Sequence, residues 1–489
     1  MGGEKNPDGV KTYPADQHDL DSYVQASGQL SQLRAPVLLD SNDPHARLFV
    51  AAFDGTGNSM YKDDPKNHTN VAGVVQQLEA GMHRNIGYGY VEGPGTQDGW
   101  LKSTRDQMSG RTFEPRVEQM YRQFTEQSKQ WLDQDPKAQI NVAGIGFSRG
   151  AEQEAAFARL VHERGIQDPS GATYSKDKDG NITGVEFSKP PLVAPGQVPQ
   201  AVGLFDPVGT GEPRNHDRRL PPSVMSAFQI TAEDERRDLF KSTSILREGF
   251  SEDKRFLNVT VGGAHSNIGG SYELNGLSIR SGNLMTDYLN GLSDKPFLDK
   301  RAEPQDPSLN VVHRSDKHQF FYTTRDFRDG QRDHTDIVAS KQQVKDHSVA
   351  DPTRKEPIDE RMDGRFERRP VPIGDTPGRP ASPQAAVQEG SDIDRTFARL
   401  AEAARNRDDG AFRAAAQDHA RSDAGQSWLQ NGREQYQQMK AEQAQAAPQQ
   451  QQQAQPQQQQ QQQAQPPQQQ QQPPHQQQPP SMQPRMPGQ

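Results

Sequence analysis

Ser148 lies at the centre of a G-x-S-x-G pattern formed by residues 146–150. An apolar run, residues 139–145, precedes this pattern, and residues 151–160, whose composition favours a helix, come after it. A strand, this pattern and a helix in succession are typical of a nucleophile elbow, which presents a serine at the carboxyl edge of a sheet. Side chains at Gly146 and Gly150 would collide with the neighbouring elements of so tight a turn. The alternative is a glycine-rich connection in which the serine only caps a helix.

An acid and a histidine come after Ser148 in the chain order that a serine hydrolase requires on such a scaffold. A buried-strand pattern, residues 200–205, ends at Asp206, and an alternating segment, residues 255–261, leads into a glycine-flanked loop that carries His265. Asp206 would accept a hydrogen bond from one imidazole nitrogen, and the other nitrogen would take the proton of Ser148. Taken singly, the aspartate could cap a turn and the histidine could be an ordinary surface residue. Their order and their strand-end positions together predict a Ser148–Asp206–His265 triad.

The oxyanion hole of such a site needs two backbone N–H groups. One would belong to Arg149, the residue after the nucleophile, and the other to a loop that follows an early strand. Residues 48–53 form a continuous apolar strand that runs into Asp54-Gly55-Thr56-Gly57, so Gly55 or Thr56 is the candidate second donor. Phosphatases with an aspartyl nucleophile also carry Asp-Gly-Thr after a strand, but they need a second aspartate two residues upstream, where this chain has Ala52. The phosphatase interpretation therefore fails.

Several motifs together resemble one family. The α/β-hydrolase lipases that include the type VI secretion phospholipase effectors of the first Tle class carry similar stretches in the same order. In this chain they are residues 53–58 with Thr69-Asn70-Val71, 146–151, 204–209, 232–240 and 263–272. The resemblance covers roughly residues 45–295. Three residues depart from the family pattern: Asn267 replaces the usual Asp, Ser271 the usual Gly, and Pro207 a common Thr.

The resemblance implies an α/β-hydrolase fold with a mostly parallel central sheet. It also implies an antibacterial toxin that hydrolyses the fatty-acyl ester bonds of membrane glycerophospholipids, with a cognate immunity protein as partner. Catalysis would pass through an acyl-enzyme on Ser148 and would need no metal or organic cofactor. A general carboxylesterase or lipase without a toxin role is one alternative. A catalytically idle hydrolase fold used for binding is another.

Composition is compatible with a secreted toxin. The chain of 489 residues has a net charge of −9, which argues against nucleic acid as a partner, and it contains no cysteine, which excludes disulfides and thiolate metal sites. It has no run of 18 apolar residues, and its first residues lack the apolar core of a signal peptide. We therefore expect a specialised system to export it from the cytoplasm of its producer to the periplasm and membrane surface of a target cell.

Composition also changes along the chain and predicts five regions. We expect an irregular N-terminal lead (residues 1–44), the catalytic domain (45–340), a charged, proline-rich linker (341–390), a small helical module (391–445) and a disordered Gln/Pro-rich tail (446–489). The linker should uncouple the hydrolase from the helical module and the tail, so a chain that ends near residue 345 is expected to fold.

The helical module and the Gln-rich tail loosely resemble the C-terminal signal domains of antibacterial type IV secretion effectors. This resemblance implies that the secretion machinery binds the C-terminal region, whereas the alternative is inert low-complexity sequence. The candidates for membrane contact lie elsewhere, around Trp100-Leu101 and Met108 and in the aromatic stretch 320–322. Residues 177–185 weakly resemble a calcium loop, but their glycine comes two positions early, so a β-hairpin is favoured.

Overall fold

The computed structural model of the protein describes residues 7–81, 83–96, 112–178, 180–211, 216–314, 332, 334–335, 357–377, 410, 413–414, 417–418 and 421. The chain divides into a unit of residues 1–380 and a second unit of residues 381–489. The few described residues of the second unit are helical. The rest of the expected module 391–445 and the whole expected tail 446–489 lie outside the described residues.

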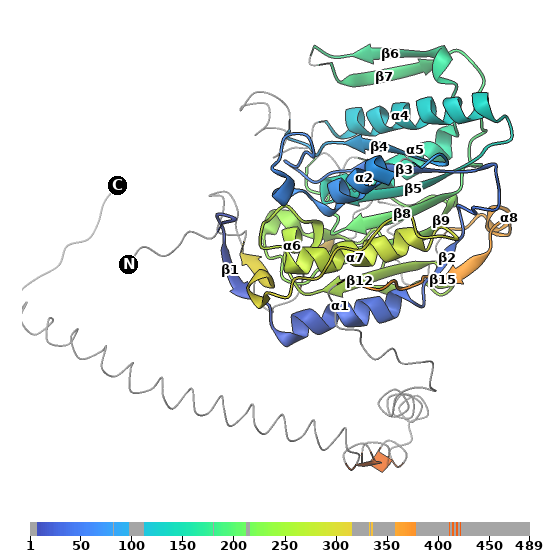
Figure 1. Cartoon of the computed structure of the whole chain (residues 1–489). Coiled ribbons are helices and arrows are strands. Elements are labelled where there is room, and N and C mark those ends of the chain that lie inside the picture. Colours follow the sequence, from blue (N-terminus) through green and yellow to red (C-terminus); the bar gives the residue numbers. More distant parts are fainter. Residues whose placement is uncertain are drawn as a thin grey trace, which may run out of the picture. The chain divides into compact units, whose positions relative to one another are not determined.

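A seven-stranded sheet, in the order β11-β12-β9-β8-β5-β3-β4, forms the centre of the first unit (Figure 1). All neighbouring strands run parallel except the short edge strand β11, which is antiparallel to β12. The strands are β3 (Ala46–Phe53), β4 (Ile86–Val91), β5 (Gln139–Phe147), β8 (Gln200–Phe205), β9 (Val224–Ala232), β11 (Gly249–Phe250) and β12 (Phe256–Val261). Helices cover both faces of this sheet, so the predicted α/β fold with a mostly parallel sheet is confirmed.

The alternation of side chains along β3 shows how the two layers are built, because successive residues of a strand point to opposite faces. Leu48, Val50 and Ala52 pack with α1, α2 and α7. Phe49, Ala51 and Phe53 pack with α4 and α5 on the other face. The helices are α1 (Gln17–Leu30), α2 (Asn70–Gly81), α4 (Phe113–Gln134), α5 (Arg149–Arg164), α6 (His265–Gly269), α7 (Gly276–Asn290) and α8 (Glu360–Asp363). Strands buried on both faces are apolar almost throughout, which explains the runs seen in the sequence.

Short strand pairs complete the unit. The antiparallel pair β6 (Ala172–Lys176) and β7 (Ile182–Phe187) confirms the hairpin predicted at residues 177–185. The parallel pair β10 (Ser242–Thr243) and β14 (His334–Thr335) lies near the carboxyl edge of the sheet, since Val208 forms a bridge with Ser242. Single turns of 3₁₀ helix occur at Pro65–Asn67, Pro169–Gly171, Asp238–Phe240 and Pro307–Leu309. Of the helices that the structure describes, none combines the length and the apolarity needed to cross a bilayer.

The expected irregular lead, residues 1–44, is wrong where the structure describes it. Strand β1 (Lys11–Pro14) pairs with β13 (Val311–Arg314), and helix α1 begins with an Asp16–Asp19 capping box. The apolar residues of α1 are spaced three to four positions apart in an otherwise polar helix, which is why composition alone suggested irregular structure. The Tyr23 hydroxyl donates to the carbonyl of Gly262 at 2.8 Å, just before the loop that carries His265. The N-terminal segment thus packs on the unit that contains the seven-stranded sheet.

Part of the expected linker, residues 341–390, also packs on the unit that contains the seven-stranded sheet. Strand β15 (Arg368–Pro370) pairs antiparallel with β2 (Arg34–Pro36). Met362 and Val371 are buried, and the Val371 N–H donates to the carbonyl of Leu33 at 3.0 Å. The residues around these few buried side chains are mostly prolines and charged residues, so the composition of the segment predicted a linker. The folded unit therefore extends past residue 340, where the sequence predicted the end of the catalytic domain.

Candidate active site

The carboxyl ends of three parallel strands bring the predicted triad residues to one edge of the sheet. Ser148 comes directly after β5, Asp206 directly after β8, and His265 begins α6 shortly after β12. The last residues of β5 and β8 pair with each other, and the Ser148 N–H donates to the carbonyl of Phe205 at 3.0 Å. Active sites of open parallel sheets lie at this edge.

The turn at Ser148 has the strained backbone of a nucleophile elbow. Ser148 adopts φ 59° and ψ −125°, a conformation that non-glycine residues rarely adopt. A Cβ at Gly146 would collide with the backbone of Gly150 and Ala151, and a Cβ at Gly150 would collide with the carbonyls of Phe53 and Asp54. Helix α5 starts at Arg149, so its positive end lies beside the serine.

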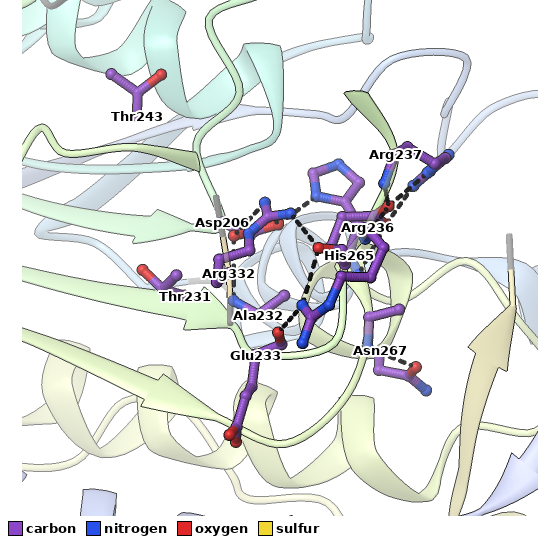
Figure 2. Close-up of polar contacts among 12 residues, drawn as sticks. Asp206, Thr231, Ala232, Glu233, Arg236, Arg237, Thr243, His265, Asn267 and Arg332 are labelled. Carbon is purple, nitrogen blue, oxygen red and sulfur yellow. Dashed lines mark hydrogen bonds and ion pairs between the residues drawn. The ribbon is translucent and has the colours of Figure 1, made fainter. Parts of the chain in front are cut away.

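Asp206 and His265 form the hydrogen-bonded half of the predicted triad (Figure 2). The Nδ1 atom of His265 lies 2.6 Å from Oδ2 of Asp206, and Oδ1 of Asp206 accepts the Ala232 N–H at 3.1 Å. All three residues are buried, with exposed fractions of 4% for Ser148, 0% for Asp206 and 3% for His265. No hydrogen bond joins Ser148 to His265 among the described residues. Catalytic hydrogen bonds are often long before substrate binds.

The charge states suit a neutral base next to an ionised acid. Burial lowers the pKa of His265 despite the opposing effect of Asp206, so the imidazole is neutral near pH 7. Burial raises the pKa of Asp206, but the charge of Arg332 and the hydrogen bond from His265 outweigh it and hold the pKa below its usual value. An aspartate that stays ionised stabilises the imidazolium that forms during proton transfer.

Arg332 and Glu235 surround this pair and were not predicted from the sequence. Nη2 of Arg332 lies 2.9 and 3.2 Å from the two carboxylate oxygens of Asp206, and its Nη1 donates to the carbonyl of Glu235 at 3.1 Å. Glu235 is itself paired with Arg237 at 2.7 Å and faces the His265 N–H at 3.4 Å. Burial raises the pKa of Glu235, but Arg237 and Arg332 lower it to about 2. Figure 2 shows the side chain of Arg332 beside Asp206.

Two aromatic rings hold the imidazole of His265. The ring centroid of Phe147 lies 4.6 Å from that of His265, and Phe240 meets it edge-on at 5.1 Å. The Arg237 guanidinium lies 3.4 Å from the centroid of Phe240. The stretch 232–240, which the sequence matched to the family without a role, thus wraps around the candidate catalytic histidine.

The loop after β3 supplies the second oxyanion candidate. The Gly55 N–H is donated to Oδ1 of Asp54 at 2.7 Å, which favours Thr56 over Gly55 as the donor to substrate. The Thr56 hydroxyl accepts from Nη1 of Arg149 at 3.1 Å, so the two candidate donors, Arg149 and Thr56, belong to adjoining segments. A Cβ at Gly55 would collide with the Phe147 ring.

Thr69 and Asn70, which precede and begin α2, fix this loop and the histidine loop. The hydroxyls of Thr69 and Tyr90 donate to Asp54 at 2.7 and 2.5 Å. Burial raises the pKa of Asp54 to about 6 despite these donors. The amide of Asn70 donates to the carbonyl of Ile268 in α6 at 2.8 Å.

The family departures Asn267 and Ser271 have structural consequences. The Asn267 amide donates to the carbonyl of Val311 at 2.9 Å, which a carboxylate could not do, and its Oδ1 accepts the Ala264 N–H at 3.1 Å. Ser271 has φ 91°, a backbone conformation that favours the glycine usual at this position. Nothing in the structure explains Pro207.

Two further expectations concern features that the structure only partly describes. Among the described residues, no group of three or more His, Asp or Glu side chains could hold a metal ion. The candidates for membrane contact, Trp100-Leu101, Met108 and residues 320–322, lie outside the described residues.

Comparison with known proteins agrees with the predicted resemblance. Residues 47–178 match the family model of the catalytic domain of Tle1-like type VI secretion phospholipase effectors. This stretch contains Ser148 and the loop with the candidate oxyanion donors, and the match confirms the resemblance to the first Tle class. No curated protein matches the chain.

Three solved structures are similar to part of this chain. An uncharacterised Pseudomonas aeruginosa protein is 15% identical, with 60% of this chain and 51% of that chain covered and a TM-score of 0.31. A Tle1 effector bound to the VgrG spike of the type VI secretion system is 20% identical, with 46% and 51% covered and a TM-score of 0.29. The esterase Est2 of Thermogutta terrifontis is 13% identical, with 52% and 89% covered and a TM-score of 0.27. This chain thus spans about half the length of the first two.

Proposed function

We propose that this protein is a serine hydrolase that cleaves the fatty-acyl ester bonds of membrane glycerophospholipids as an exported antibacterial effector. The observation that carries the proposal is the 2.6 Å contact between His265 and Asp206 at the strand edge where the elbow presents Ser148. The family match at residues 47–178 supports a phospholipase effector. A general carboxylesterase is the alternative from the same chemistry.

The proposed reaction uses Ser148 as the nucleophile. His265 removes the Ser148 proton as the hydroxyl attacks the ester carbonyl, and Asp206 stabilises the resulting imidazolium. The backbone N–H groups of Arg149 and Thr56 stabilise the oxyanion. His265 then protonates the departing lysophospholipid, and water, activated by the same imidazole, hydrolyses the acyl-enzyme to release a fatty acid.

Phospholipid vesicles and mass spectrometry test this reaction. The full-length protein should release free fatty acid and lysophospholipid, and Ser148→Ala should reduce turnover about 10⁶-fold. His265→Ala should be nearly as damaging, and Asp206→Asn should cost about 10⁴-fold. Release of phosphorylated head groups, or activity retained by Ser148→Ala, would refute the proposed chemistry. Activity on soluble esters alone would favour the carboxylesterase.

The proposed delivery needs an export partner and an immunity partner. We propose that secretion machinery recognises this protein, with its C-terminal region as the candidate contact, and that a cognate immunity protein blocks it in sister cells. Periplasmic expression of the full chain should kill a test bacterium, and Ser148→Ala should not. Equal killing by both proteins would show that toxicity does not arise from ester hydrolysis.

A further inference from the structure

A cavity of about 450 Å³ lies between α2 and α7, outside the catalytic groups described above. Its walls include Asn70 and Gln76 of α2 and Ser278 and Thr286 of α7, so polar side chains line much of its length. The N-terminal residues of both helices, each at least twelve residues long, take part in the lining. The positive ends of two helix dipoles therefore face the same space.

The charged residues that line this cavity are Lys66 and Arg301, and none of its lining residues is an aspartate or glutamate. The carboxylate of Glu273, which is not a lining residue, pairs with Lys66. The two other described cavities, beside α4 and α5 and beside α1, contain carboxylates as well as basic side chains. In a chain of net charge −9, a basic, concave, low-dielectric site would attract anions, because field lines focus there.

Arg301 is the central group of the cavity. Its Nη2 donates to Oδ1 of Asn70 and, at 3.1 Å, to the carbonyl of Ser278, but no carboxylate in the described part of the chain pairs with it. Burial lowers the pKa of Arg301 to about 10, so the guanidinium stays charged at neutral pH. A largely buried cation without a counter-ion is unfavourable unless an anion compensates it. Lys66 lies farther out, with a side chain 56% exposed and paired with Glu273.

We propose that this cavity binds a phosphate-class oxyanion, held by the fork of Arg301 with Lys66 at its entrance. Planar guanidinium groups bind such oxyanions through paired N–H groups. Asn70 gives the site a link to catalysis, because it contacts Arg301 with its oxygen and the carbonyl of Ile268, in the His265 loop, with its nitrogen. The anion could be the phosphate of a lipid head group, a source that rests on the proposed function, or free phosphate.

Thermal unfolding of the full-length protein tests anion binding without any activity readout. Inorganic phosphate should raise the unfolding midpoint by at least about 2 °C relative to sodium chloride at the same ionic strength, because a ligand that binds only the native state stabilises it. Lys66→Gln and Arg301→Lys should each weaken the apparent phosphate affinity about tenfold or more. Arg122→Gln, the matched control in an exposed ion pair on α4, should respond like the wild type.

Two outcomes would overturn the proposal. One is the absence of a phosphate-specific shift in the wild type, and the other is an equal shift in the wild type, Lys66→Gln and Arg301→Lys. If Arg301→Lys does not fold, the rim variant Lys66→Gln still decides, since its side chain is half exposed.

Kinetics then distinguish the two sources of the anion. Phosphate that competes with phospholipid vesicles, while hydrolysis of a soluble p-nitrophenyl ester is unchanged, identifies a head-group site. Phosphate that changes both activities alike identifies a free-anion site acting through Asn70. Failure of phospholipid hydrolysis with an intact thermal shift would refute the proposed function and leave the anion site standing.

Discussion

Replacement of Arg332 by glutamine should show how much the arginine contributes to catalysis through Asp206, while Ser148, Asp206 and His265 stay in place. Arg332 touches no substrate in the proposed reaction, but its Nη2 contacts both carboxylate oxygens of Asp206 at 2.9 and 3.2 Å. The arginine side chain is 3% exposed and the aspartate is fully buried, so solvent screens this pair little. We therefore expect Arg332→Gln to act on kinetics through the orientation and charge of Asp206.

The expected fall in kcat/KM and in stability follows from the contacts that Arg332→Gln removes. A hydrogen bond to a charged group contributes about 1.5–3 kcal/mol, and at 1.36 kcal/mol per factor of ten kcat/KM should fall about 10- to 150-fold. Removing one partner of a buried pair destabilises a protein by about 3–5 kcal/mol; Asp206 keeps its His265 and Ala232 donors, so the lower end applies. Loss of the cation also lets the Asp206–His265 pair bind a proton more readily, so the acid limb of kcat/KM should move to higher pH.

The assay is hydrolysis of a soluble p-nitrophenyl ester between pH 5 and pH 9, with circular dichroism melts of the same preparations. Arg332→Lys keeps the positive charge but lacks the paired N–H groups of the guanidinium. It should therefore return the acid limb of the kcat/KM profile most of the way to its wild-type pH, while recovering only part of kcat/KM itself. Arg122→Gln, on an exposed face, should match the wild type in every readout. A folded Arg332→Gln protein with wild-type kcat/KM and an unmoved acid limb would refute the positioning role, even if its melting temperature fell.

Three further predictions concern pH and chain length. Because burial lowers the pKa of His265, the acid limb of the wild-type kcat/KM profile should lie below pH 6.5, and an acid limb above pH 6.5 would contradict this. The contribution of His265 to folding stability should be present above pH 6.5 and should be lost as the pH falls. The folded-state pKa of Asp54, about 6 against 3.8 unfolded, means that its contribution is present below pH 3.8 and lost as pH rises through 6. Urea unfolding should therefore show Asp54→Asn gaining stability relative to wild type between pH 4 and pH 8, on the order of 3 kcal/mol; a constant difference would contradict it. A chain ended after residue 380 should melt and hydrolyse ester like the full chain. A chain ended after residue 345, which the sequence predicted to fold, loses buried Met362 and Val371 and should melt several degrees lower.

The sequence identified the elements of the sheet that carry the candidate site because local physics determines them. Strands buried on both faces must be apolar, and the turn at Ser148 leaves no room for side chains at Gly146 and Gly150. Asp206 and His265 could be placed because each comes soon after such a strand. The Ser148–His265 link and the oxyanion donors remain predictions.

The other parts of the fold and of the candidate site could not be predicted from the sequence because they depend on long-range contacts. Arg332 approaches Asp206 from 126 positions away, in a segment without apolar periodicity. Helix α1 and strand β15 pack on the sheet-containing unit through a few buried side chains among many polar ones, so composition reflected the polar residues rather than these contacts. Thr69 and Asn70 were visible as a motif, but only the fold shows that they fix two different loops of the candidate site.

The distribution of strain argues against an idle hydrolase fold used for binding. Two non-glycine residues with positive φ, Ser148 at 59° and Asp206 at 38°, lie at one strand edge, and such conformations cost about 1–3 kcal/mol each. The same edge buries the charges of Asp206, Glu235 and Arg332, whereas apolar residues of similar volume would be neutral or stabilising there. Set against a total stability of about 5–15 kcal/mol, these terms are large. A surface that only binds a partner gains nothing from these terms, whereas the proposed reaction needs a serine presented at this edge and an ionised aspartate beside the imidazole.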